Sequence, residues 1–176
     1  LEGTTLTAWG MNNALVVVSF SPRGGLLNAP DTYMDKIAIG PGMPTGVIDL
    51  DASPQDNVIN LARAKGVSPS EITVCVLERE RHQYIIDGVI SVGGRVRLIS
   101  DGDVAGIMGA AGLGTGVDMY IGRGGAPEGV LAAAALRCIG GQMQGRLMFE
   151  NEEQIARALS MRITDPNRKY SVEEMA

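Results

Sequence analysis

The sequence is short of histidine, cysteine and aromatic residues, and these shortages exclude several classes of site. With one histidine and two cysteines among 176 residues, it holds no Cys/His cluster at the spacing of a zinc site. It also has no Gly-x-Ser-x-Gly elbow and no Walker-type phosphate loop, so covalent serine hydrolysis and nucleoside triphosphate chemistry are poorly supported. Aromatic residues make up 4% of the chain, too few for an aromatic-rich binding surface. The single histidine, His82, is open to two interpretations, an acid or base near neutral pH and a structural side chain.

The sequence also lacks a long apolar run and a strong positive charge, which restricts the expected partners. No apolar stretch reaches the roughly 20 residues of a membrane-spanning helix, so we expect no membrane partner. The net charge is −5, which argues against a nucleic-acid partner and means that an anionic substrate needs arginine or a metal ion close by. Cys75 and Cys138 lie in apolar runs, and we expect two buried, reduced thiols and a cytoplasmic location.

What the chain does contain is typical of one globular unit with many tight turns. Apolar residues make up 45% and charged residues 20%, which is ordinary for a soluble protein, and 24 glycines suit turns at ligand-binding loops. The first residue is Leu1 rather than Met, and residues 170–176 resemble the start of an amphipathic helix that stops early. We therefore expect a fragment that lacks sequence at both ends.

Residues 122–129, Gly-Arg-Gly-Gly-Ala-Pro-Glu-Gly, carry the most informative local pattern. The apolar run before them predicts a buried strand over residues 117–121, and the glycines let the backbone approach a ligand closely. Pro127 suits the first position of a helix over residues 127–139, and a strand, a glycine turn and a helix N-terminus together suit an anion. Glu128 would repel a phosphate unless a cation lay between them, which indicates a metal-assisted phosphate site. The alternative is an acidic residue that stabilises the first turn of a helix.

The first half of the chain is expected to be mostly antiparallel. Its β-branched run predicts a central strand over residues 14–20, followed by a hairpin through a short return strand over residues 25–28 and a third strand over residues 33–39. A serine followed by Pro54 then predicts a capped helix that ends at Gly66.

The second half alternates apolar strands with helices. The expected strands and helices follow one another over residues 72–77, 81–92, 95–99, 104–111, 117–121 and 127–139. This order predicts a parallel sheet covered by helices, and hence the α/β class. We divide the chain at the change of pattern, into residues 1–66 and residues 67–176.

Charged residues follow each of the three strands of the second half. They are Glu78-Arg79-Glu80-Arg81, Asp101-Gly102-Asp103 and the glycine stretch with Glu128. Since ligands bind beyond the carboxyl ends of parallel strands, the three segments should face one crevice. Arg79 and Arg81 suit phosphate oxygens, and the two aspartates suit sugar hydroxyls or a hard cation. Taken singly, the first segment has an alternative explanation as a solvated charge run, and the second as a turn that caps the next helix.

Five ordered motifs together resemble the class II fructose-1,6-bisphosphatase family. In chain order they are Leu1-Glu2-Gly3-Thr4-Thr5 with Asn13-Ala14-Leu15, Asn28-Ala29-Pro30-Asp31-Thr32-Tyr33-Met34-Asp35-Lys36, Asp101-Gly102-Asp103-Val104-Ala105, Gly124-Gly125-Ala126-Pro127-Glu128-Gly129, and Met143-Gln144-Gly145-Arg146-Leu147. The resemblance implies the layered α-β-α-β-α fold that this family shares with inositol monophosphatases. It places residues 1–66 in the metal-binding phosphatase subdomain and residues 67–176 in the substrate-binding subdomain.

The resemblance also implies which residues act. Glu2 and Glu128 are the implied ligands of Mn²⁺ or Mg²⁺, and Thr4 is the hydroxyl implied beside the attacking water. The implied substrate contacts are Glu2, Gly3, Thr4, Tyr33, Arg79, Glu80, Arg81, Asp101, Gly102, Asp103 and Gly125. Carboxylates suit these hard cations, and such an ion both activates water and neutralises the charge that develops on a phosphate.

The implied activity is metal-dependent hydrolysis of the 1-phosphate of fructose 1,6-bisphosphate, a step of gluconeogenesis, in a homo-oligomer that is a tetramer by resemblance. Sedoheptulose 1,7-bisphosphate, an inositol or sugar monophosphate, and a non-catalytic phosphosugar-binding fragment remain as alternatives. The chain departs from the family because the family's further acidic ligands upstream and its C-terminal part are absent, and because Arg123 stands where a small apolar residue is expected. We therefore expect activity in the parent protein and little or none in residues 1–176 alone.

Overall fold

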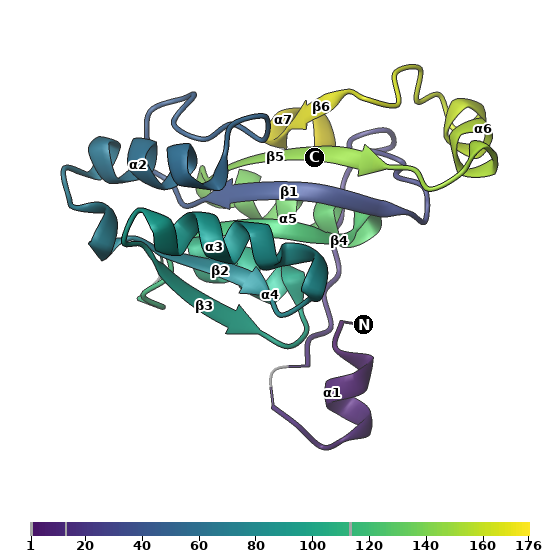
Figure 1. Ribbon diagram of the computed structural model, residues 1–176. Helices are drawn as coiled ribbons and strands as arrows, with labels where there is room; N and C mark the ends of the chain where they lie inside the picture. Colours follow the sequence, from purple (N-terminus) through teal and green to yellow (C-terminus); the bar gives the residue numbers. More distant parts are fainter. Residues whose placement is uncertain (1, 13, 113) are drawn as a thin grey trace.

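A mixed six-stranded sheet forms the centre of the computed structural model, which describes residues 2–12, 14–112 and 114–176 (Figure 1). Two motif residues, Leu1 and Asn13, lie outside the described residues. The strands lie in the order β3-β2-β4-β1-β5-β6. Their bounds are β1 Tyr33–Ile39, β2 Thr73–Leu77, β3 Arg95–Ile99, β4 Met119–Gly125, β5 Gln142–Met148 and β6 Lys169–Ser171. β2 pairs in parallel with β3 and β4, whereas β1 is antiparallel to β4 and β5, so the expected α/β class is confirmed.

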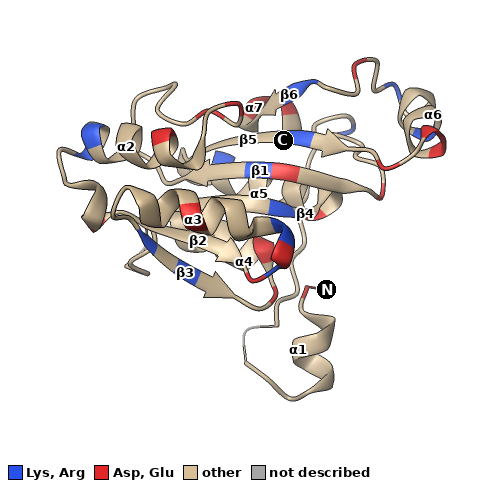
Figure 2. Ribbon diagram, viewed as in Figure 1, with Lys and Arg blue, Asp and Glu red and all other residues tan. Residues whose placement is uncertain are grey.

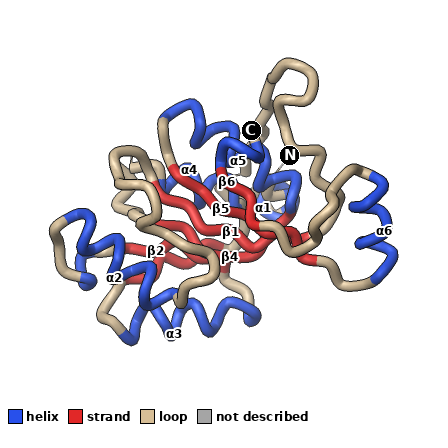
Figure 3. The backbone as a smooth tube through the Cα atoms, turned by 90° about the horizontal axis from the view of Figure 1, so that it is seen from above, coloured by secondary structure: helices blue, strands red, loops and turns tan. Residues whose placement is uncertain are grey.

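Helices cover both faces of this sheet, as the view from above shows (Figure 3). In the described part of the chain they are α1 Thr4–Ala8, α2 Pro54–Lys65, α3 Gln83–Ser91, α4 Asp103–Ala110, α5 Ala126–Ile139, α6 Glu152–Ser160 and α7 Val172–Met175, with short 3₁₀ helices η1 Pro69–Glu71 and η2 Glu80–His82. Because successive residues of a strand point to opposite faces, Ile37 and Ile39 of β1 pack with α2 and α3. Met34 and Ala38 of the same strand pack with α4, α5 and α7 on the other face.

Local sequence signals correctly predicted several elements. β1 and β3 occupy the expected ranges. Helix α2 begins after Ser53, whose side chain accepts a hydrogen bond from the N–H of Asp56 at 3.1 Å, and it ends at Gly66 in the left-handed conformation with φ 69°. Helix α3 begins later than the expected residue 81, because the 3₁₀ turn η2 precedes it.

The strand predicted over residues 14–20 and its hairpin are wrong. One isolated bridge joins Leu15 to Glu2, and the rest of the run pairs with no other described strand. Residues 25–28 form no strand either, since the backbone N–H of Leu27 donates to α7 instead. A β-branched run becomes a strand only where another backbone pairs with it, and a local pattern does not say whether that partner is present.

The glycine stretch is also not the loop that the sequence suggests. Residues 122–125 continue β4, where Gly122 pairs opposite Lys36 and Gly125 opposite Tyr33 of β1. The chain then passes directly into the N-terminus of α5. A Cβ atom at Gly124 would collide with the carboxylate of Asp103, so this strand position needs glycine because a side chain approaches it closely.

The prediction of two buried thiols holds for Cys75 alone. Cys75 lies in β2 and is buried, whereas Cys138 is exposed. The reason is that Cys138 belongs to the last turn of α5, where residues 137–140 are all exposed. Both thiols are free.

One sheet contains strands from both expected subdomains, because β1 lies between β4 and β5. The division of the chain at residue 66 stays a prediction.

The sequence patterns above do not predict β5, β6 or α6. Across the described ranges, every helix is too short or too polar to cross a membrane.

Candidate active site

A pocket of about 320 Å³ opens where the carboxyl ends of β2, β3 and β4 meet the start of α5. Its lining consists of Glu2, Tyr33, Leu77, Arg79, Arg81, Asp101, Asp103, Gly124, Gly125 and Glu128. Tyr33 joins this edge because β1 runs antiparallel to β4, which brings the start of β1 beside the end of β4. Figure 2 shows acidic and basic segments side by side at this end of the sheet, next to α4. The pocket thus unites eight of the twelve site residues expected from the sequence.

Glu2 lies over the N-terminus of α4. Its Oε1 accepts a hydrogen bond from the N–H of Val104 at 2.8 Å, and its Oε2 accepts one from the N–H of Ala105 at 3.3 Å. These are N–H groups of the first helical turn, which have no partner inside the helix. Burial, together with the neighbouring carboxylate of Asp103, raises the pKa of Glu2 to about 7. The side chain is therefore anchored, and its charge is unfavourable without a cation nearby.

Asp103 is held by a buried ammonium group. Lys36 of β1 is fully buried, and its Nζ pairs with Oδ2 of Asp103. The same Nζ donates a hydrogen bond to the carbonyl oxygen of Gly125 at 2.7 Å. Lys36 thereby ties together the first turn of α4 and the junction of β4 with α5, the two segments that carry Asp103 and Glu128.

Glu128 lies in the first turn of α5, where a carboxylate is favoured by the helix dipole. Its Oε2 comes so close to Gly125 that a Cβ atom there would collide with it. The glycine therefore gives the carboxylate room to lie against the end of β4, in the same pocket as Glu2.

The arginines contribute exposed positive charge to the same lining. Arg79 donates hydrogen bonds at 2.8 Å to the carbonyl oxygens of Glu78 and Ser100, which join the ends of β2 and β3. The guanidinium of Arg81 lies 5.1 Å from the ring centroid of Tyr33, a cation–π contact. It also donates to the carbonyl oxygen of Arg123 at 3.0 Å. Both guanidinium groups are held by neutral acceptors, so their charge remains available to an anion.

Four expected site residues lie outside this lining. Gly102, in the left-handed conformation with φ 90°, caps α4, and a Cβ atom there would lie 3.6 Å from Oε2 of Glu2. Gly3 is buried, and Thr4 is exposed at the first position of α1. Glu80 is exposed in η2. The structure places Gly102 against a site residue and leaves the Thr4 hydroxyl outside the pocket.

The sequence patterns do not single out Lys36 as a site residue, although one signal is visible in retrospect. Lys36 is a charged residue in a strand whose other members, apart from Asp35, are apolar or aromatic, and a fully buried charge requires a partner. The partner, Asp103, is 67 residues away, so no local pattern reveals it.

His82 is a structural side chain, in line with the second of its two interpretations. It is buried, its Nδ1 lies 2.8 Å from the carbonyl oxygen of Leu77, and its Nε2 accepts a hydrogen bond from the N–H of Arg123 at 2.9 Å. Both ring nitrogens are occupied, and the ring does not line the pocket. The Arg123 side chain forms a two-point ion pair with Asp35.

The donor chemistry of the pocket fits a hard divalent cation, but the described residues supply only part of a ligand set. Glu2 and Glu128 offer carboxylate oxygens of the kind that Mn²⁺ and Mg²⁺ prefer. Asp103 is already engaged by Lys36. No group of three or more acidic, histidine or cysteine side chains is placed to hold one ion within residues 2–12, 14–112 and 114–176.

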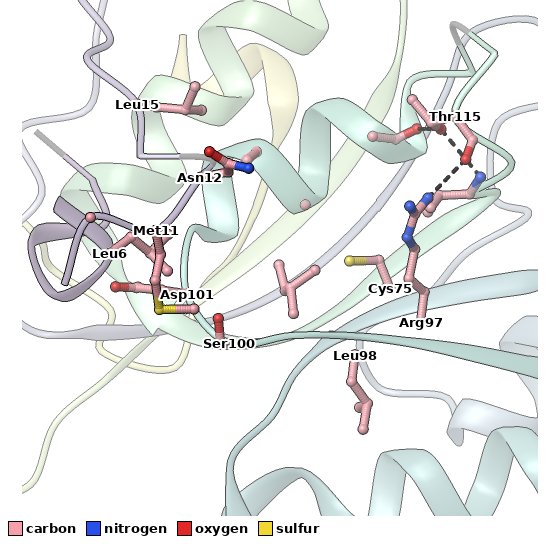
Figure 4. Close-up of a pocket in the computed structure, with 16 residues that line it drawn as sticks. Leu6, Met11, Asn12, Leu15, Cys75, Arg97, Leu98, Ser100, Asp101 and Thr115 are labelled. Atoms are coloured by element: carbon pink, nitrogen blue, oxygen red, sulfur yellow. Dashed lines mark hydrogen bonds between the residues drawn. The ribbon is translucent and has the colours of Figure 1, made fainter.

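A larger cavity of about 830 Å³ adjoins the pocket and shares Asp101 with it (Figure 4). It lies between β3, α4 and the segment that contains α1. Arg97 spans its far side by donating to the carbonyl oxygen of Thr115 at 2.8 Å. Burial raises the pKa of the Cys75 thiol to about 11, so this cysteine stays protonated near neutral pH and is a poor nucleophile.

Comparisons with known proteins give a consistent result. A family model described as bacterial fructose-1,6-bisphosphatase, glpX-encoded, matches residues 1–176. Relatives named D-fructose 1,6-bisphosphatase class 2/sedoheptulose 1,7-bisphosphatase are 41% identical in Microcystis aeruginosa and 40% identical in Synechocystis, each over 99% of this chain and 54% of the relative. A relative of the same name in Synechococcus is 38% identical over 99% of this chain and 56% of its own length. The chain thus spans about half the length of the curated relatives it matches.

Proposed function

Because the chain belongs to the glpX-encoded family of bacterial fructose-1,6-bisphosphatases, we propose that the whole protein hydrolyses the 1-phosphate of fructose 1,6-bisphosphate to fructose 6-phosphate and phosphate. One observation carries the proposal: the carboxylates of Glu2 and Glu128 share a pocket with the guanidinium groups of Arg79 and Arg81. A bisphosphate needs both, acidic groups for a cation at the reacting phosphate and arginine for the remote one.

The arginines bind the phosphate that does not react. Arg79 and Arg81 are exposed and line the pocket, and a guanidinium group matches phosphate oxygens in a two-point contact. Tyr33 orients Arg81 through its ring. Asp101 and Asp103 accept hydrogen bonds from sugar hydroxyls. Binding energy from this remote end positions the reacting phosphate at the acidic side of the pocket.

Glu2 and Glu128 would hold Mn²⁺ or Mg²⁺ at the acidic side, with further ligands from parts of the whole protein outside residues 1–176. When bound, such an ion supplies an activated water and neutralises charge on the phosphate. In the reaction the water oxygen bonds to phosphorus, the bond from phosphorus to the sugar oxygen breaks, and that oxygen takes up a proton. The chain itself contributes anchored carboxylates, the Lys36-bound Asp103 and, once brought to the pocket, the Thr4 hydroxyl that orients the water.

The remaining properties of the whole protein follow the same proposal. Its fold is the layered α-β-α-β-α arrangement, with the expected division at residue 66. It acts in the cytoplasm, in gluconeogenesis, as a homo-oligomer with four subunits. Sedoheptulose 1,7-bisphosphate is the second candidate substrate, because the relatives carry both activities in their names.

Phosphate release from fructose 1,6-bisphosphate by the whole protein, with Mn²⁺ and after chelation, tests the proposal. We expect Glu128→Gln to lower turnover by about a hundredfold or more, because a neutral amide is a weak ligand for a hard cation. Glu150→Gln is the matched control, since Glu150 is exposed and lies outside the pocket lining. Turnover that survives Glu128→Gln unchanged would contradict the role of Glu128, and phosphosugar binding without phosphate release would favour a non-catalytic module.

A further inference from the structure

Tyr120 of β4 carries a buried polar atom whose hydrogen bond is missing. Within the part of the chain that the structure describes, its hydroxyl oxygen Oη is the only buried side-chain polar atom without a hydrogen-bond partner. The whole side chain is 0% exposed. Burying a hydroxyl without a partner is unfavourable, so such groups in folded proteins nearly always have one, often an ordered water molecule. The Tyr120 hydroxyl therefore marks a binding interaction that the neighbouring side chains do not supply by themselves.

The hydroxyl lies on the face of β4 that supports the pocket. Tyr120, Gly122 and Gly124 alternate along this strand and so share one face. A Cβ atom at Gly122 would lie 3.2 Å from Oη of Tyr120, and one at Gly124 would collide with the carboxylate of Asp103. The phenol thus extends along the strand towards its carboxyl end. Its hydroxyl lies over Gly122, and the carboxylate lies over the next position of the same face.

Helix α4 covers both groups. A Cβ atom at Gly106 would lie 3.1 Å from the ring of Tyr120, so the helix comes close to the ring at a glycine. Gly106 is three residues after Asp103 and therefore on the same side of α4. The ring and the carboxylate lie together between α4 and β4, where Asp103 and Gly124 are also part of the pocket lining.

The chemistry of these groups suits a hydroxyl that donates towards a carboxylate. Burial raises the pKa of Tyr120 well above its ordinary value, and the negative charge of Asp103 raises it further, so the phenol stays protonated. Lys36 pairs with Oδ2 of Asp103. Since a carboxylate has about four acceptor positions, Asp103 keeps room for another donor. One water molecule connects two polar groups that are too far apart for a direct hydrogen bond.

We propose that Tyr120 is a positioning residue, whose hydroxyl donates to a buried water molecule that in turn donates to the carboxylate of Asp103. Tyr120, through the water, and Lys36 would then both hold this carboxylate and fix its orientation at the pocket. The consequence for the substrate rests on the proposed function, in which Asp103 accepts a hydrogen bond from a sugar hydroxyl. A ligand as small as water is the appropriate one, because Oη is closed off from solvent.

A high-resolution crystal structure of the whole protein tests the water molecule directly. We expect a water oxygen about 2.7–3.0 Å from Oη of Tyr120 and equally close to a carboxylate oxygen of Asp103. No ordered water at Oη would overturn the proposal. The observation requires no turnover, so its failure and a failure of the proposed phosphatase activity are separate results.

The Tyr120→Phe variant removes the hydroxyl and keeps the ring. We expect the melting temperature of the whole protein to fall by about 1–4 °C, because a buried hydrogen bond is lost. A hydroxyl with no partner predicts the opposite sign, since its removal also removes the cost of burying it. An unchanged or higher melting temperature would therefore contradict the proposal. Tyr84→Phe is the matched control, because Tyr84 on α3 is 62% exposed, and it should leave the melting temperature unchanged.

Kinetics of the same variants separate positioning from a purely structural role. We expect Tyr120→Phe to raise KM for fructose 1,6-bisphosphate by about threefold to tenfold and to leave kcat nearly unchanged, because the sugar contact of Asp103 is made in both the bound substrate and the transition state. A purely structural role would lower the fraction of active protein, and hence kcat, at an unchanged KM. That result would overturn the positioning role of Tyr120. Tyr84→Phe should change neither constant.

Discussion

At the scale of single residues, the buried pair of Lys36 and Asp103 is the interaction on which the pocket depends most directly. Replacing Lys36 by Met leaves a buried carboxylate without a cation. We expect this change to cost about 3–5 kcal/mol of unfolding free energy, the usual effect of removing one partner of a buried pair. Urea unfolding of residues 1–176 measures it.

Lys169→Met is the matched control for that variant. Lys169 forms ion pairs too, with the carboxylates of Asp49 and Asp51, but both of these carboxylates are exposed. Water and salt screen such a pair, so we expect a much smaller loss. Similar losses for the two variants would show that burial of the Lys36 pair has no energetic consequence.

His82 gives the molecule a dependence on pH whose sign the structure fixes. Burial lowers the pKa of His82 below its ordinary 6.5, and the positive charges of Arg81 and Arg123 lower it further. Below about pH 6.5 the unfolded chain therefore binds more protons than the folded one, so the stability contributed by neutral His82 is present above that pH and is lost as the pH falls through the folded pKa. We expect unfolding free energy to decrease from pH 7 towards pH 5.

Nuclear magnetic resonance measures this pKa directly, because the chain has one histidine and hence one ring signal to follow. The His82→Gln variant serves as the comparison. It should be less stable at every pH, since the hydrogen bonds to Leu77 and Arg123 change, but its stability should depend less on pH between 7 and 5. A ring that titrates at or above 6.5 would refute the prediction.

At the scale of elements, the sequence correctly predicted features that depend on neighbouring residues. The predictions failed where the structure depends on pairing between strands that are distant in the chain. The range of β1 and the caps of α2 follow from residues next to one another, and both were predicted correctly. The glycines of β4 suggest a loop when taken alone, yet their pairing with β1, about 88 positions away, makes them a strand. Residues 14–20 show the converse, a strand pattern with most of its pairing unmade.

Gly124 lies in β4 directly against the carboxylate of Asp103, so its substitution tests how closely this strand packs against the pocket. In Gly124→Ala the new methyl group would collide with Asp103 and lie 3.2 Å from Nζ of Lys36. We expect a loss of about 1–3 kcal/mol of unfolding free energy, the usual cost of overpacking a core. Urea unfolding measures it.

Gly109→Ala is the control within the same protein. Gly109 lies inside α4, and a Cβ atom there would meet nothing closer than a side-chain carbon of Val117 at 4.0 Å. Alanine is the better helix former, so this variant should gain about 0.5–1 kcal/mol. A Gly124→Ala variant as stable as Gly109→Ala would show that β4 has room for a side chain.

At the scale of the whole molecule, the pocket is assembled from segments that are far apart in the chain. The sequence predicted that the ends of β2 and β3 and the start of α5 face one crevice, because the carboxyl ends of parallel strands share an edge, and the pocket lining contains all three. The approach of Glu2 and Tyr33 to that edge depends on a bridge and on an antiparallel strand, which spacing does not reveal. Glu2 and Tyr33 were predicted as site residues from the resemblance to a family.

The proposed division of roles between arginine and carboxylate in the pocket leads to a prediction about substrate choice. Truncating Arg81 to Ala removes a guanidinium group that faces the pocket and leaves Glu2 and Glu128 in place. A hydrogen bond to a charged group contributes about 1.5–3 kcal/mol, so we expect KM for fructose 1,6-bisphosphate in the whole protein to rise by about tenfold to a hundredfold. A sugar with one phosphate, which lacks the remote group, should lose much less. Arg157→Ala on α6, whose side chain is exposed and outside the pocket, should change neither. If Arg81→Ala weakened the two substrates equally, arginine would be acting at the reacting phosphate, and the assignment of the two ends of the pocket would have to be reversed.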